Sequence, residues 1–201
     1  LWAVGRMHAA DRPPNIVIVF FDDLGWGDLG AFGAKQIRTP NIDRLASQGT
    51  RFTSFYVSQP VCSASRASLL TGCYANRIGI HGALFPGAPT GISANEKTLA
   101  EVLKSRGYAT GMVGKWHLGS QKEFLPVRHG FDDYLGLPYS NDMWTKHPTA
   151  KPGTYPPLPL IDGDQVVETQ PDQRFLTERY TRRAVDFIDR HRESPFFLYV
   201  A

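Results

Sequence analysis

The chain has 201 residues, of which 42% are hydrophobic and 20% are charged, the balance of an ordinary globular protein. Lysine and arginine number 22 against 19 acidic residues, and a net charge of +3 is too small to indicate a nucleic acid or an anionic membrane as partner. Two cysteines exclude a disulfide framework, and no apolar run approaches the roughly 18 residues of a membrane span.

Residues 1–13 come before the first predicted element. Small and apolar side chains dominate residues 1–10, as they do at the tail of an export signal. We interpret residues 1–13 as the remnant of such a signal or as a leader. The protein is therefore expected to be exported to a periplasmic, extracellular or lysosome-like compartment.

Five elements are predicted in the first half of the chain. Asn15–Phe21 is a continuous apolar run, typical of a central strand that is buried on both faces. Asn41–Gln48 has helical spacing, Arg51–Val57 alternates as a strand does, and Ser65–Leu70 is compatible with a short helix. Asn95–Arg106 predicts an amphipathic helix that a glycine stops.

Strands and helices go on alternating in the second half. Tyr108–Val113 predicts a strand, and residues 137–171 are rich in proline and turns, with one short strand near Gln165–Glu168. Asp172–Arg192 predicts a long helix, and a last strand follows at the end of the chain. We expect residues 14–201 to be the N-terminal part of a longer domain, with this last strand at an unpaired edge. The alternation indicates an α/β fold with a mainly parallel sheet.

Two acidic residues, Asp22 and Asp23, follow the first predicted strand directly. Ligands of such sheets bind beyond the carboxyl ends of the strands. Adjacent carboxylates repel each other unless a cation or a base lies between them, and their hard oxygen atoms suit Ca²⁺ or Mg²⁺. The alternative is a solvated turn, because aspartate is common at strand ends.

A second candidate is Cys62, which lies just before a predicted helix. Free N–H groups and the helix dipole favour an anion there. Arg66 follows four residues later, so its guanidinium can fold back over the same face and hold a tetrahedral oxyanion. The alternative is a buried structural cysteine at a helix start.

Lys115 and His117 stand two residues apart where another predicted strand ends. A histidine near its ordinary pKa of about 6.5 can accept a proton near neutrality. The alternative, a histidine of the core or the surface, is preferred for four others. These are His8, His81, His147 and His191.

The segments around these residues resemble motifs of the type I sulfatases. Residues 62–72, Cys-Ser-Ala-Ser-Arg followed by Leu-Leu-Thr-Gly, resemble the family signature, although Ala64 replaces its proline and Cys73 its closing arginine. Residues 22–30 and 114–119 resemble the family's D-D-x-G-x-G-D-L-G and G-K-W-H-L-G segments. The branch of arylsulfatase A and N-acetylgalactosamine-6-sulfatase is the most similar.

The resemblance implies an alkaline-phosphatase-like α/β fold and a set of roles. Cys62 would be oxidised to formylglycine, whose hydrate attacks the sulfur of a sulfate ester. Asp22, Asp23 and residue 62 would bind Ca²⁺, with Mg²⁺ as the alternative ion. Arg66 and Lys115 would stabilise negative charge, and His117 would take a proton from residue 62. Lys115 and Ser140 would contact the sulfate.

The resemblance also implies partners. The substrate would be a sulfate ester, with a sulfated carbohydrate favoured. A formylglycine-generating enzyme or a radical-type maturase would modify Cys62, and Ala64 makes the second a candidate. A phosphate or phosphonate ester hydrolase and a non-catalytic protein that binds sulfated sugar remain alternatives. Further metal ligands of the family would lie beyond residue 201, so these 201 residues alone are expected to be inactive.

Overall fold

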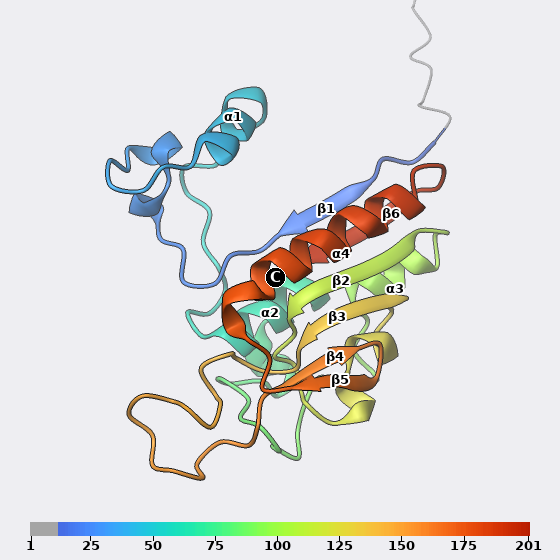
Figure 1. Ribbon diagram of the computed structural model, residues 1–201. Coiled ribbons are helices and arrows are strands. Elements are labelled where there is room, and N and C mark those ends of the chain that lie inside the picture. The colour runs from blue at the N-terminus through green and yellow to red at the C-terminus, as the bar shows by residue number, and fades with distance from the viewer. Residues whose placement is uncertain (1–11) are drawn as a thin grey trace, which may run out of the picture.

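The computed structural model describes residues 12–201, so most of the predicted leader lies outside the described part. One six-stranded sheet organises the molecule, in the order β1-β6-β2-β3-β4-β5 (Figure 1). The strands are β1 Ile16–Val19, β2 Ala109–Lys115, β3 Asp133–Leu137, β4 Pro159–Asp162, β5 Gln165–Thr169 and β6 Phe196–Val200. The first four strands in this order are parallel, and β4 and β5 are antiparallel. The predicted α/β fold with a mainly parallel sheet is confirmed.

Four α-helices accompany the sheet in the described residues. They are α1 Pro40–Gln48, α2 Cys62–Thr71, α3 Leu99–Lys104 and α4 Leu176–Arg190. Short 3₁₀ turns occupy Trp26–Asp28, Gly30–Phe32, Ala75–Ile78, Lys122–Phe124, Pro126–Arg128 and Gln173–Phe175. Figure 1 shows α4 across one face of the sheet, α2 and α3 behind the other face, and α1 apart from both.

The two faces of the sheet bury separate apolar clusters. On the α2 side, Met112 and Tyr199 of the strands pack with Ala64 and Ala67 of the helix. On the α4 side, the core includes Val113, Ala184, Phe187, Phe196 and Leu198. Close packing on that side depends on Gly111, where an added Cβ would come within 2.7 Å of the Phe187 ring. The clusters hold the carboxyl ends of β1, β6 and β2 next to the start of α2.

Strand β1 lies at the edge of the sheet, so the prediction of a central strand buried on both faces is wrong. Ile16 and Ile18 pack against the core, whereas Val17 and Val19 are 47% and 55% exposed. Helix α4 covers β6 and β2 and does not reach this face of β1. The apolar run correctly predicted a strand, but it did not predict the position of this strand at the edge of the sheet.

The last strand is not at an edge, and that prediction is also wrong. Strand β6 lies between β1 and β2 and is parallel to both. Its first four residues are buried, because both of its edges are paired and both of its faces are covered. The end of the chain therefore enters the middle of the sheet.

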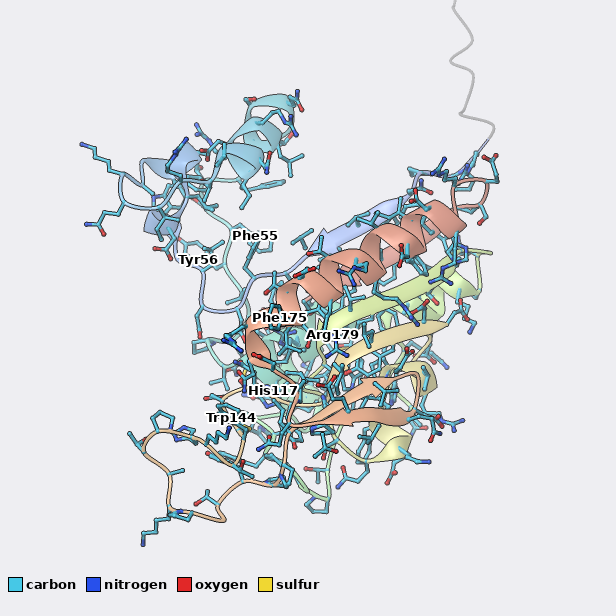
Figure 2. All side chains as sticks on the ribbon, in the orientation of Figure 1. Phe55, Tyr56, His117, Trp144, Phe175 and Arg179 are labelled. Carbon is cyan, nitrogen blue, oxygen red and sulfur yellow. The ribbon has the colours of Figure 1, made fainter. Side chains whose placement is uncertain are left out.

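The predicted strand Arg51–Val57 does not form. Phe52, Phe55 and Tyr56 are exposed, and the segment carries no strand hydrogen bonds in the described residues. Alternating apolar and polar residues form a strand only where a partner strand can supply the ladder of hydrogen bonds. Figure 2 shows Phe55 and Tyr56 on the connection between the α1 region and the rest of the molecule.

Helix α3 is shorter than the predicted Asn95–Arg106 because a capping box fixes its start. The Thr98 hydroxyl accepts from the N–H of Glu101 at 3.1 Å, and the Glu101 carboxylate accepts from the N–H of Thr98 at 2.9 Å. Similarly, Asp172 caps a 3₁₀ turn, and α4 begins only at Leu176. Strands β3 and β4 were not predicted, and Pro159 at the start of β4 is a poor strand former.

We predict that Phe187→Ala lowers the free energy of unfolding by about 3–5 kcal/mol, because the ring fills the space above Gly111 and its removal leaves a cavity. Val185→Ala, on the same helix but 51% exposed, is the control and should change it by less than about 1 kcal/mol. Urea denaturation of both variants measures the difference. Equal losses would show that α4 is not anchored through Phe187.

Candidate active site

The predicted site residues gather at the carboxyl ends of the parallel strands. Asp22 and Asp23 follow β1, and Lys115 is the last residue of β2. Cys62 is the first residue of α2, because the helix begins three residues earlier than the predicted start at Ser65. Val61 precedes it in an extended conformation, so the first N–H groups of the helix open toward this region. Segments from far apart in the sequence thus meet at one end of the sheet.

Arg66 is wholly buried and connects these segments. Its Nη1 donates to the carbonyl oxygen of Lys115 at 2.6 Å, and its guanidinium lies 5.4 Å from the centre of the Phe20 ring. Its Nη2 is 3.5 Å from the Asp22 carboxylate, an ion pair without hydrogen-bond geometry. Nε and Nη2 have no hydrogen-bond partner among residues 12–201. A buried cation with unused donors is suited to an anionic ligand.

Asp22 lies between two cations. Lys115 Nζ donates to its Oδ2, and the same Nζ is 3.5 Å from the Ser140 hydroxyl. Burial raises the pKa of Asp22, but the hydrogen bond and charge of Lys115 and the charge of Arg66 outweigh it, so this pKa lies below its ordinary value. The structure thus brings together Lys115 and Ser140, the two residues expected to contact the sulfate, and keeps Asp22 ionised.

His117 is fully buried, and its backbone has a φ of 60°, which is unusual for a residue other than glycine. Its Nε2 is 2.8 Å from the carbonyl oxygen of Leu84, whereas Nδ1 is buried without a partner in the described residues. Burial and the nearby charge of Lys115 lower the pKa of His117 to about 4, although the Leu84 carbonyl opposes the shift. The expected pKa near 6.5 is therefore corrected: the ring is neutral at pH 7.

Two clefts meet at Asp22. One, of about 180 Å³, is lined by residues that include Asp22, Asp23, Cys62 and Ser65. The other, of about 240 Å³, is lined by Asp22, Arg66 and Lys115, by Asn141 from the segment after β3, and by residues of the α4 region that include Thr177. The two carboxylates have the hard oxygen donors that Ca²⁺ or Mg²⁺ prefers. No group of three histidine, cysteine or acidic side chains with metal-site geometry exists within residues 12–201.

Other predicted assignments can be located. The sequence assigns Asp28 to a cap or turn, and its carboxylate accepts from the N–H of Gly25 at 2.7 Å. His81 is exposed, and His147 accepts from the N–H groups of a following turn. The His191 ring packs against the Phe187 ring at a tilt of 47°. His8 lies outside the described residues.

Similarity to known proteins identifies the family of the chain. The model of the Sulfatase family matches residues 14–201. The chain belongs to the sulfatase family. It is 46% identical to arylsulfatase A of Homo sapiens over 217 residues, covering all of this chain and 43% of that protein. It is 40% identical to N-acetylgalactosamine-6-sulfatase of Rattus norvegicus, covering all of this chain and 41% of that protein.

Solved structures are also similar, among them the crystal structure of the PsFucS1 sulfatase from Pseudoalteromonas sp., at 30% identity and a TM-score of 0.78 over 94% of this chain and 43% of that one. The crystal structure of Ps i-CgsB is 36% identical, with a TM-score of 0.80, over 94% of this chain and 44% of that one. A second structure of Ps i-CgsB contains k-i-k-neocarrahexaose. The chain spans less than half the length of these relatives and neighbours.

The sequence alone did not reveal three other contributors to the site. The Tyr199 hydroxyl is 3.5 Å from Arg66 Nη1, and Ser63 and Leu84 lie behind His117. Tyr199 is one of several aromatic residues in an apolar strand, so the sequence around it does not distinguish it from a residue of the core. Leu84 contributes a backbone carbonyl, which no sequence motif encodes.

We predict that acid destabilises this protein through His117. The unfolded chain binds a proton at this ring near pH 6.5, whereas the folded protein does not until about pH 4. The contribution to stability is therefore complete above pH 6.5 and falls by about 3 kcal/mol as the pH drops to 4. Urea denaturation between pH 4 and 7.5 should show this loss in the wild type and much less of it in His117→Gln. His81→Gln, at an exposed site, is the control. An unchanged slope in His117→Gln would contradict the assignment.

Proposed function

We propose that the protein hydrolyses sulfate esters and that residue 62 acts as formylglycine in the working enzyme. The observation that carries this proposal is the buried guanidinium of Arg66. Two of its nitrogens have no hydrogen bond within residues 12–201, it stands next to Lys115, and it lies on the helix that begins at Cys62. This is the arrangement that a tetrahedral dianionic or monoanionic group requires. Membership of the sulfatase family makes sulfate the favoured group.

Formylglycine, when present, supplies a hydrated aldehyde as nucleophile. The residues of the chain orient and protect this group. Arg66 and Lys115 hold negative charge on the sulfate and on residue 62, and the Ser140 hydroxyl, 3.5 Å from Lys115 Nζ, contacts the sulfate. His117 is neutral at pH 7 because of its burial, so it can accept a proton from residue 62. A maturase must oxidise Cys62 first, with Ala64 and Cys73 as departures from the signature that it reads.

Calcium is the proposed cofactor, with Mg²⁺ as the alternative. Bound there, the ion acts as a Lewis acid on a sulfate oxygen. Asp22 and Asp23 line one cleft with Cys62, and the oxygen of a modified residue 62 would replace the soft sulfur as a hard donor. Ca²⁺ takes about 6–8 oxygen ligands, so these residues would supply part of the coordination shell. Asp22 would then share its charge between the ion and the two cations beside it.

The proposed substrate is a sulfated carbohydrate. The support comes from relatives: one carries N-acetylgalactosamine-6-sulfatase as its name, and Ps i-CgsB has been solved with k-i-k-neocarrahexaose. The second cleft places the amides of Asn141 and Gln173 and the hydroxyl of Thr177 next to Lys115, and such groups can bind sugar hydroxyls.

We also propose that the protein is exported. In the described part of the chain no helix has the length and apolar character needed to cross a membrane.

Activity on an aryl sulfate tests the proposed function. We predict that peptide mass analysis of the full-length protein, made in a host that matures other sulfatases, shows formylglycine at position 62 and that Cys62→Ala loses activity by at least about 10³-fold. Cys73→Ala is the matched control and should retain it. A stoichiometric thiol at Cys62 with wild-type turnover would refute the proposal. Faster hydrolysis of the corresponding aryl phosphate would favour the alternative phosphoesterase.

Calcium binding has its own test. We predict that Ca²⁺ raises the melting temperature of the full-length protein and that Asp22→Ala and Asp23→Ala each remove this rise together with activity. Without calcium, Asp22→Ala should also lower the free energy of unfolding by about 1–2 kcal/mol, because it leaves Arg66 and Lys115 without their carboxylate. Asp23→Ala should not. Asp28→Asn is the control, and a normal calcium response in either site variant would contradict the assignment.

A further inference from the structure

The segment 82–92 lies between the start of α2 and the turn after β2. The N–H of Leu84 donates to the Ser63 hydroxyl at 3.0 Å, and the carbonyl of the same residue faces His117 Nε2 at 2.8 Å. Further along, the N–H of Ile92 donates to the Leu118 carbonyl at 2.8 Å. One peptide segment therefore connects α2, which begins at Cys62, with the turn that contains His117.

The contact with Leu84 determines which nitrogen of His117 carries the hydrogen. A backbone carbonyl can only accept, so Nε2 must be the donor. In the neutral ring Nδ1 then has the free lone pair. Nδ1 is buried and has no hydrogen-bond partner within residues 12–201, so this lone pair is available.

The backbone of His117 makes this orientation dependent on its surroundings. A φ of 60° is costly for a residue with a side chain and persists only where neighbouring contacts enforce it. The ring is fully buried, and the hydrogen bond to Leu84 is the polar contact that fixes its rotation. Leu84 is held in turn by Ser63, whose side chain is also fully buried.

We propose that Ser63 is a positioning residue, which through the peptide of Leu84 holds His117 as the Nε2–H tautomer and so makes Nδ1 the nitrogen that accepts the proton. The inference rests on the proposed function insofar as that proton comes from residue 62. Ser63 immediately follows Cys62 on α2. The helix that presents the nucleophile therefore also positions its base, and a small shift of α2 moves both together.

Kinetics of the full-length protein provide the first test. Ser63→Ala removes the acceptor of the Leu84 N–H, and we expect kcat on an aryl sulfate to fall about fivefold to tenfold with little change in KM. Ser63→Thr keeps the hydroxyl and should restore most of kcat. Ser68→Ala is the matched control, because Ser68 lies on the same helix with a buried hydroxyl that has no partner in the described residues. Rates are divided by the formylglycine content from peptide mass analysis, because Ser63 lies in the modified motif.

Nitrogen NMR of the ¹⁵N-histidine-labelled protein provides a second test that does not depend on turnover. The His117 signals are assigned by their loss in His117→Gln. Above pH 6.5 we expect a protonated Nε2 and an unprotonated Nδ1 in the wild type, Ser63→Thr and Ser68→Ala, and a mixture of tautomers in Ser63→Ala. A protonated Nδ1 in the wild type, or an unchanged tautomer with unchanged kcat in Ser63→Ala, would overturn the inference. The expected tautomers in a protein without sulfatase activity would refute the proposed function and leave the positioning by Ser63 intact.

Discussion

The burial of one guanidinium is the constraint on which the site depends. Arg66 reaches from α2 to the end of β2 through the Lys115 carbonyl, to the end of β1 through Phe20 and Asp22, and to β6 through Tyr199. A buried charge is costly unless it is paired and hydrogen-bonded. The strand ends must therefore stay close to α2, and the fold and the site are held by the same contacts. Two guanidinium nitrogens form no hydrogen bond in the described part of the chain, so an anionic ligand that bonds to them would reduce the cost of burying this charge.

The charges around Arg66 determine the protonation states of Asp22 and His117. The two cations lower the pKa of Asp22 against the effect of its burial, and the same cations with burial lower the pKa of His117. At neutral pH the site thus contains a carboxylate, two cations and an uncharged imidazole. An anionic ligand meets positive charge, and the imidazole remains free to accept a proton. Neither state follows from residue type alone, because each depends on the other charges nearby.

Local patterns predicted most elements, but the order of strands could not be read from them. The apolar run of Asn15–Phe21 indicates a strand equally well at the centre or the edge of a sheet, and only the helices decide which faces are covered. The motifs placed Asp22, Lys115 and His117 correctly at or just after strand ends, because the carboxyl ends of parallel strands meet at one edge of the sheet, and they placed Arg66 on the helix beside them. The depressed pKa of His117 could not be predicted, since it arises from burial and from a lysine whose direction is set by the fold.

The contact between Leu84 and His117 has a consequence for how this sequence can change. Both polar atoms that Leu84 contributes belong to the main chain. Every amino acid has the carbonyl, and only proline lacks the N–H that Ser63 accepts. The side chain at position 84 can therefore be substituted while the main-chain contacts stay in place. Residue identity at this position is a poor guide to its importance, and variation there offers a way to reshape the surroundings of the imidazole without removing its support.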